Sequence, residues 1–429
     1  MTNYKKMAKT LISEDLIKVT PNERTPKTVK DLLDEKNYVI DVHTHFFDMH
    51  CINSGYFVLR TIKDFLGIRG EIDKAAEEDL VEKIYKTSDV YTEGWNERLA
   101  KNIELENAKR GGIRSIVFKL LWYTKMEKVY KYYLKDSSLA TYFNLHNSKV
   151  ITTVLMMDFY KGWGVKVKKS LKNQIIELKQ MQLKHPVLPF LFCDPRRADE
   201  TDNEENLYVL FDLAFTGNYP FFGVKIYPCL GYDPSDYRLW PIYAICEKLS
   251  IPVITHCGGS SVTTDKSSLL VYEGDKPTTI KGKNRKEVGH LLNDPIRWSL
   301  VLEKFPKLKL NIAHFGSDGT WTNNDFVNDK GEPQNRKETI IKFMKAYDNV
   351  YSDFSYTITH EEASKNFIKK LKDESVVAER SMFGSDYWVV SKEGQLDDNQ
   401  EKFLDMVEDP KMINDLCKEV PRQFLFDKV

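Results

Sequence analysis

Two histidines separated by one residue are the part of the sequence best suited to chemistry. They stand in Asp41-Val42-His43-Thr44-His45, at the end of an apolar run. Side chains alternate along an extended strand, so His43 and His45 face the same way, about 7 Å apart. Two imidazoles in this arrangement can bind one divalent cation. A pair of hydrogen-bonded histidines without a metal explains the motif equally well when it is taken alone.

Three further polar residues follow apolar runs, each near a glycine where the chain can turn. His256 follows the run 252–255, His314 follows 310–313, and Asp386 ends Phe383-Gly384-Ser385-Asp386. In a barrel of parallel strands the carboxyl ends share one face, so residues far apart in the sequence can meet there. A chance arrangement explains this repeated pattern poorly, and we expect a single site.

The elements that must position these residues are eight short, β-branched runs with helical sequence between them. Several begin about 30–40 residues apart, the length of one strand–helix unit. The pattern predicts an α/β protein with a TIM (β/α)8 barrel. Pro189 argues locally against the third run as an interior strand. The runs are 38–42, 151–156, 187–192, 222–226, 251–255, 308–313, 349–353 and 381–385.

Two intervals between runs are longer than one helix requires. Residues 51–149 carry apolar positions at helical spacing, which predicts a helical insertion after the first strand. Within it, 116–118 is an alternative candidate for the second strand. The second long interval, 258–293, follows the fifth run. We expect an N-terminal arm at 1–35 and a barrel domain at 36–429 that includes the insertion.

Composition excludes several classes of protein. Of 429 residues, 41% are hydrophobic and 29% charged, which excludes a disordered or collagen-like chain. Lysine plus arginine and aspartate plus glutamate each total 63, so no global positive field attracts nucleic acid or an anionic membrane. No apolar run approaches the ~18 residues of a membrane span. The six cysteines form no CxxC pair and no secretory leader is evident, which favours a cytoplasmic location.

With these motifs in place, the sequence resembles the amidohydrolase superfamily, in particular its amidohydrolase-related branch of TIM-barrel metal-dependent hydrolases and decarboxylases. The resemblance implies that His43, His45, His256 and Asp386 hold a divalent ion. These donors suit zinc and tolerate manganese or iron, and one ion is favoured over two. The matching stretches follow the family's order and are 41–45, 223–228, 255–258, 313–316 and 383–387.

The resemblance also implies a reaction. The ion would lower the pKa of a water from 15.7 toward ~7, Asp386 would move its proton, and a neutral His314 would orient the substrate. We therefore predict a metal-dependent hydrolase acting on an amide, ester or lactone-type bond of a small molecule. Non-oxidative decarboxylation is the alternative, and a catalytically silent barrel used for binding is a third hypothesis. Self-association into a homo-oligomer stays open.

Lys225 lies in the fourth run, where two-metal relatives carry a carboxylated lysine that bridges the ions. By that resemblance His256 and His314 would then bind the second ion. An ammonium beside a cation is repelled, so an inward-pointing Lys225 must be carboxylated, neutral or paired with a substrate carboxylate. Arg196, Tyr227 and Trp388 follow strand ends and are weaker candidates for substrate contacts. Packing at the barrel rim explains the two aromatic residues equally well, and a loop arginine that caps Asp194 or faces solvent explains Arg196 at least as well.

Overall fold

The computed structural model describes residues 4–13, 16, 20–48, 50–53, 56, 125–259, 262–322, 325–328, 330–387 and 396–428. Eight strands form one sheet in which every neighbouring pair is parallel. In sheet order they are β1 (Val39–Thr44), β2 (Val150–Leu155), β3 (Val187–Phe192), β4 (Gly223–Ile226), β5 (Val253–Thr255), β8 (Leu310–Ile312), β9 (Val350–Asp353) and β10 (Ser381–Met382).

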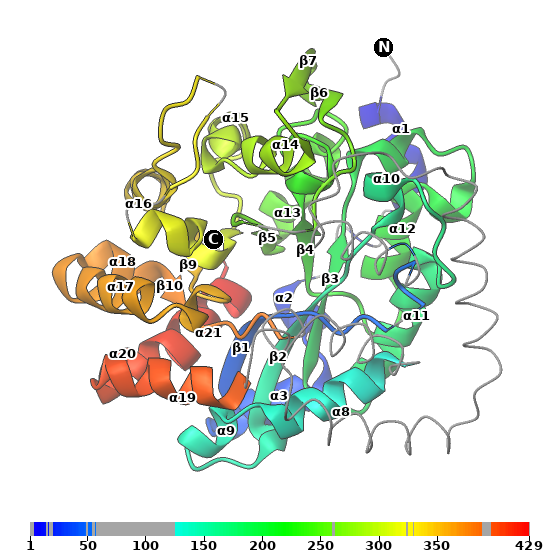
Figure 1. The fold of residues 1–429 in the computed structure, drawn as a ribbon. Helices are drawn as coiled ribbons and strands as arrows, with labels where there is room; N and C mark the ends of the chain where they lie inside the picture. The colour runs from blue at the N-terminus through cyan, green and yellow to red at the C-terminus, as the bar shows by residue number, and fades with distance from the viewer. Residues whose placement is uncertain are drawn as a thin grey trace.

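The sheet closes on itself between its first and last strands. Just beyond β10, Tyr387 pairs in parallel with Thr44 of β1. The backbone N–H of Asp386 donates to the carbonyl oxygen of His43 at 2.8 Å, and the N–H of Val42 donates to that of Phe383 at 3.4 Å. The molecule is therefore a TIM barrel, as the spacing of the apolar runs predicted (Figure 1).

Helices connect the consecutive strands and cover the outside of the barrel (Figure 1). Between β2 and β10 they are α10 (Tyr160–Trp163), α11 (Leu171–Gln182), α12 (Leu207–Phe215), α13 (Trp240–Leu249), α14 (Arg285–Leu292), α15 (Ser299–Lys304), α16 (Arg336–Ala346), α17 (Glu361–Asp373) and α18 (Ser375–Arg380). Those before β2 and after β10 are α1 (Tyr4–Leu11), α2 (Pro21–Arg24), α3 (Lys27–Glu35), α8 (Met126–Asp136), α9 (Leu139–Tyr142), α19 (Leu396–Val407), α20 (Pro410–Asn414) and α21 (Val420–Phe426).

All eight apolar runs are barrel strands, including the one that contains Pro189. The carbonyl oxygen of Pro189 accepts from the N–H of Phe222 at 2.8 Å. On the same side of the strand, a backbone N–H at position 189 would point toward the residues that precede β4, which begins at Gly223. No strand residue lies there to accept a hydrogen bond, so the missing N–H of the proline does not interrupt β3. The prediction that Pro189 argues against this strand was therefore wrong.

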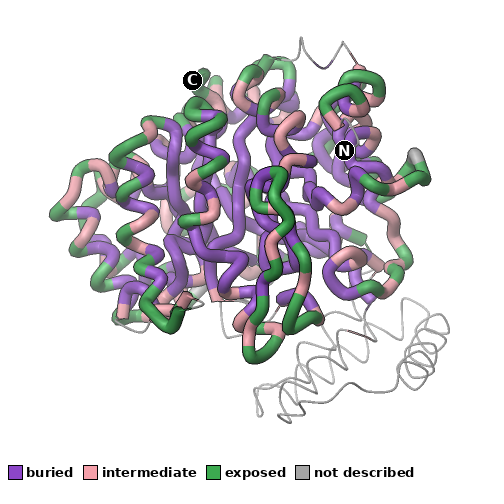
Figure 2. The backbone as a smooth tube through the Cα atoms, turned by 90° about the horizontal axis from the view of Figure 1, so that it is seen from above, coloured by how far each residue is buried: buried purple, intermediate pink, exposed green. Residues whose placement is uncertain are grey.

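Strand alternation divides the buried side chains of the barrel into two layers. Figure 2 shows the buried segments in the middle of the molecule and the exposed ones at its periphery. One layer, with Val224 and Ile226 of β4, packs between the barrel and its helices. The other, with Phe190 and Ile254, fills the barrel interior together with residues of α3 and α21. Since α3 leads directly into β1, these two helices lie at the amino-terminal end of the strands.

The segments outside the barrel strands match the predictions in part. The described part of the predicted N-terminal arm contains α1, α2 and α3, and buried Arg24 donates to the carbonyl oxygens of Leu249 and Ser250. Most of the predicted insertion, including 116–118, lies outside the described residues, and its described C-terminal end carries α8 and α9. The interval after β5 holds an unforeseen hairpin of β6 (Ser268–Glu273) and β7 (Lys276–Lys281). In the ranges described, no helix is long and apolar enough for a membrane span.

The close packing of the barrel interior predicts that Gly223 tolerates no side chain. A Cβ at this position would lie 2.2 Å from Cε1 of Phe190. We expect Gly223→Ala to lower the free energy of unfolding by about 1–3 kcal/mol, because the neighbouring ring has no space to move into. Urea unfolding measures this loss. Adding Phe190→Leu should reduce the cost of the alanine, and an alanine variant as stable as the parent would contradict the packing.

Candidate metal centre

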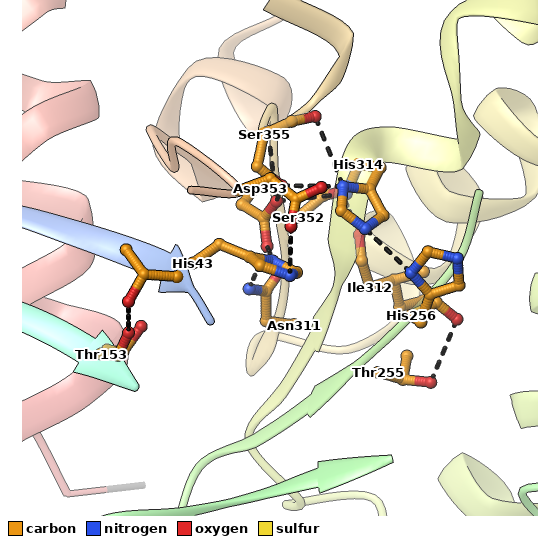
Figure 3. Close-up of polar contacts among 12 residues, drawn as sticks. His43, Thr153, Thr255, His256, Asn311, Ile312, His314, Ser352, Asp353 and Ser355 are labelled. Atoms are coloured by element: carbon orange, nitrogen blue, oxygen red, sulfur yellow. Dashed lines mark hydrogen bonds and ion pairs between the residues drawn. The ribbon is translucent and has the colours of Figure 1, made fainter. Parts of the chain in front are cut away.

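Five of the predicted side chains lie at the carboxyl end of the barrel. His43 is the last but one residue of β1, and His45 directly follows the strand. His256 follows β5, His314 follows β8 and Asp386 follows β10. All five are buried. Neighbouring imidazole centroids are 5.4 Å apart for His43 and His45, and 4.7 Å apart both for His43 and His314 and for His256 and His314. The four rings thus form a continuous row, three of which Figure 3 labels.

The backbone is distorted where it carries these residues. Asp41 pairs with Thr152 and Thr44 pairs with Val154, so β1 has one residue more than β2 between these two pairs. A bulge of this kind re-aims side chains, and His43 turns inward beside the interior residue Val42.

Two other site residues hold left-handed backbone. His314 has φ 62° and Asp386 has φ 49°, conformations that cost a non-glycine residue about 1 kcal/mol or more. Gly384 approaches His43 so closely that a Cβ would lie 2.7 Å from the Cβ of His43. A side chain at this position would collide with His43, which explains the glycine.

Asp353, the last residue of β9, organises this site, and the sequence analysis did not select it. Its Oδ2 accepts from Nδ1 of His43 at 3.0 Å and from Nδ2 of Asn311 at 2.7 Å. Its Oδ1 accepts from the backbone N–H groups of His314 (3.1 Å) and Ser355 (3.2 Å) and from the Ser355 hydroxyl (Figure 3). Burial alone would raise the pKa of Asp353, but the electrostatic attraction and the hydrogen bond of the His43 N–H group, helped by His314 and Ser355, hold it well below its usual value.

These acceptors determine where His43 and His45 carry their protons. The carboxylate of Asp353 and the carbonyl oxygen of Leu155 can only accept, so both histidines are protonated on Nδ1, at 3.0 Å from the acceptor in each case. Burial lowers the pKa of both imidazoles, which are therefore neutral. Each Nε2 carries a lone pair and lies 3.6 Å from Oδ1 of Asp386.

The two Nε2 lone pairs and the Asp386 oxygen lie close enough together to bind one divalent cation. Ligand atoms of His43, His45 and Asp386 all lie within 4.8 Å of one another. Two ligands at 2.0–2.2 Å from a tetrahedral zinc ion are ~3.3–3.6 Å apart, which agrees with the observed 3.6 Å. Nε2 of His43 has no hydrogen-bond partner within the described ranges. A cation would remove the repulsion between these lone pairs.

His256 is connected to this group through His314. The ionised Asp353 takes the only hydroxyl proton of Ser355, so Ser355 Oγ accepts from Nδ1 of His314 at 2.8 Å. His314 Nε2 must then accept from Nδ1 of His256, at 2.9 Å. Nε2 of His256 is left buried with no hydrogen-bond partner in the described part of the chain. His256 does not belong to the group formed by His43, His45 and Asp386, so its role as fourth ligand stays a prediction.

A second group of three side chains is also close enough together to hold a metal ion. Ligand atoms of His43, His314 and Asp353 lie within 4.8 Å of one another. However, the two oxygens of Asp353 already accept five hydrogen bonds. Asp353 therefore fits the role of a residue that orients histidine ligands better than that of a ligand.

The weaker candidates lie in different surroundings. Arg196 forms two hydrogen bonds with Asp194, at 2.9 and 2.5 Å, and donates to the carbonyl oxygen of Leu230. The ring of Tyr227 stacks on His256, with centroids 4.2 Å apart. Trp388 lies outside the described residues. Arg196 is therefore held by Asp194 and Leu230, and Tyr227 packs against an imidazole of the site.

Fold and site together define a TIM barrel with a histidine–aspartate centre at the carboxyl end of its strands. The chain belongs to the amidohydrolase family, whose model matches residues 182–426. The resemblance found in the sequence is therefore confirmed. No curated protein sequence matches the chain.

Solved structures similar to the chain share little sequence with it. An uncharacterised TIM-barrel protein from Bordetella bronchiseptica is 17% identical, with a TM-score of 0.44, over 70% of this chain and 83% of its own. A 4-oxalomesaconate hydratase from Rhodopseudomonas palustris is 10% identical, with a TM-score of 0.43, over 90% and 95%. A zinc-bound amidohydrolase from Burkholderia multivorans is 11% identical, with a TM-score of 0.40, over 73% and 92%. The reaction must therefore be argued from the site itself.

The role of Asp353 predicts the behaviour of Asp353→Asn. An amide cannot accept all five hydrogen bonds, so the imidazoles should lose their fixed tautomers while the barrel still folds. We expect zinc affinity, measured by competition with a chelator, to fall about 10–100-fold. The control is Asp318→Asn, because Asp318 lies near His360 rather than near the centre. Unchanged affinity in Asp353→Asn would contradict the proposed orientation.

Lys225 is buried in the same part of the barrel, and its charge predicts a pH-dependent stability. Burial lowers its pKa from 10.5 to about 8, against the attraction of Asp353 and Asp386. Since the unfolded chain keeps this proton to higher pH, the lysine's contribution to the free energy of unfolding rises with pH between those two values. Below pH 8 the cost of the buried charge is fully present.

Replacing this lysine with an apolar residue of similar length should therefore stabilise the metal-free protein. We expect Lys225→Met to raise Tm by a few degrees at pH 7, corresponding to at least ~1 kcal/mol, and by less at pH 10.5. Thermal melts at the two pH values measure the difference. A methionine variant that melts below the parent at pH 7 would show that the ammonium has a stabilising partner.

Proposed function

We propose that the protein is a metal-dependent hydrolase that cleaves an amide, ester or lactone-type bond of a small molecule. The observation that carries this proposal is the approach of two neutral imidazoles, through Nε2 of His43 and of His45, to one carboxylate oxygen of Asp386 at 3.6 Å each. The description of the matching family, amidohydrolase, supports the same class of reaction.

His43, His45 and Asp386 would hold the ion, with His256 as the proposed fourth ligand. Two or three imidazoles and one carboxylate suit zinc best among the common divalent metals, and manganese or iron less well. We propose a single ion, because the second group of donors requires Asp353, whose oxygens are already engaged. A divalent ion there would supply Lewis acidity and lower the pKa of water toward ~7.

The remaining chemistry belongs to the chain's own residues. Asp386 would accept a proton from the attacking water and pass it to the leaving group, because its Oδ1 lies at the centre of the site. His314 is held neutral, since burial lowers its pKa well below the usual value. Its Nε2 accepts from His256 in this structure, so it orients His256, and it contacts the substrate only if that hydrogen bond breaks.

The decisive experiment combines metal analysis with a substrate screen. Zinc-loaded protein is tested against lactones, amides, esters and aromatic acids, with hydrolytic products and CO₂ both measured. We expect about one zinc per chain and hydrolytic turnover. His43→Ala should retain less than a tenth of the zinc, and Asp386→Asn should lose at least ~10³-fold in turnover, because several kcal/mol of transition-state stabilisation depend on the site.

A histidine remote from the site provides the control. His146 lies on the surface, where its ring contacts Ser148, so His146→Ala should bind zinc and turn over like the parent. Release of CO₂ in place of hydrolytic products would identify a decarboxylase. Less than about half an equivalent of any transition metal, after growth with added metal, would argue against metal-dependent catalysis.

A further inference from the structure

Lys225 points into the barrel near the metal centre, and the register of β4 shows why. Its neighbours Val224 and Ile226 pack in the layer between the barrel and the helices. Lys225 therefore faces the opposite way, beside Ile254 of β5, which belongs to the interior cluster. Its side chain extends from this apolar layer toward the carboxyl end of the strands.

The ammonium group lies within the electrostatic reach of the whole site. Its Nζ is 5.7 Å from the ring centroid of Tyr227, and that ring stacks on His256. The positive charge lowers the pKa of every imidazole in the row, namely those of His43, His45, His256 and His314. Lys225 is therefore part of the same pocket as the proposed metal ligands.

This ammonium is buried without the partner that a structural lysine would have. Nζ of Lys225 has no hydrogen-bond partner among the residues that the structure describes, although the side chain is fully buried. An unpaired buried charge destabilises a protein. Packing and stability therefore do not explain why the barrel carries a lysine here, whereas a bound anion would.

The charges around Lys225 leave it unbalanced once an ion is bound. The carboxylates that act on it are those of Asp353 and Asp386. The oxygens of Asp353 accept hydrogen bonds from His43, Asn311, His314 and Ser355. Asp386 belongs to the group that would hold the ion. A divalent cation neutralises these two carboxylates, so one positive charge remains on Lys225. A single negative charge on the ligand would complete the site.

We propose that the substrate carries a carboxylate group that pairs with the unmodified ammonium of Lys225. This inference rests on the proposed function, because it names the substrate class of the same site. One ammonium with three N–H donors matches one carboxylate in charge and in hydrogen bonds. Arg196, the other cation considered for this role, already pairs with Asp194.

Binding of simple acids and their neutral amides tests the proposal without knowledge of the substrate. Benzoate and succinate, with benzamide and succinamide as neutral counterparts, are titrated into zinc-loaded protein by calorimetry. We expect the parent to bind at least one acid about tenfold or more tightly than its amide. Lys225→Met and Lys225→Gln should lose this preference and keep the zinc content of the parent.

The matched control is a second buried lysine of the same barrel. Lys309 precedes β8 at the opposite end and donates to the carbonyl oxygens of Gln423 and Asp427. Lys309→Met should keep the preference for acids. The proposal is overturned if the parent does not distinguish acids from amides, or if the Lys225 variants retain the preference. It is also overturned by two zinc ions per chain with a carbamate signal from ¹³C-bicarbonate.

The acid titration and the hydrolytic assay are separate measurements, so this inference and the proposed function can fail separately. If the zinc-loaded parent hydrolyses nothing, the proposed function fails. Lys225 is still judged by whether the zinc-loaded parent prefers acids and the two variants do not, and a parent that binds no zinc overturns both proposals. Conversely, a hydrolase that binds zinc but shows no preference would retain the function and lose the assignment of Lys225.

Discussion

The hydrogen bonds to the buried carboxylate of Asp353 are the interaction on which the rest of the site depends. They join β9 to β1 through His43 and to β8 through Asn311 and His314. A buried carboxylate is tolerated because all its oxygens are engaged, and in return it dictates the protonation of the imidazoles. It acts directly on His43, whose lone pair is thereby left on Nε2. It acts on His256 through the hydrogen bonds of Ser355 and His314, which leave the lone pair of His256 on Nε2 as well. We therefore expect any metal affinity of the centre to depend on Asp353, although its own oxygens are already engaged.

The contacts that build the site also close the barrel. The N–H of Asp386 donates to the carbonyl oxygen of His43, and Tyr387 pairs with Thr44. Asp41 strengthens the same seam by accepting from the backbone N–H groups of His43 (3.2 Å) and Ser385 (2.9 Å). Burial raises its pKa to about 6. The imidazoles of the first strand and the carboxylate that follows the last strand therefore come together because the sheet has no edge. The same closure maintains the left-handed backbone of Asp386.

Much of the fold was predictable from the sequence, because it depends on local patterns. Eight β-branched runs separated by helical sequence define parallel strands, and even Pro189 fits one of them, since the neighbouring strand has not yet begun. The hairpin of β6 and β7 was not predicted, although residues 269–272 are apolar, because the spacing of strand–helix units indicates barrel strands and not a hairpin within one interval. The predicted site residues could be chosen because each polar residue follows a strand near a turn. Asp353 ends the seventh run in the same way, so that signal was present; its significance lies in five hydrogen bonds that no local pattern encodes.

The amino-acid sequence by itself determined the class of fold, the face on which the chemistry lies and the types of donor that meet there. Alternation and strand ends are properties of neighbouring residues, so they can be recognised without the folded chain. Only the tertiary structure decided the bulge in β1 and the tautomer of each imidazole. It also decided that Arg196 pairs with Asp194, while the buried ammonium of Lys225 has no hydrogen-bond partner among the described residues. These features depend on which acceptor lies within 3 Å of which donor, and such distances arise only when distant strands pack together.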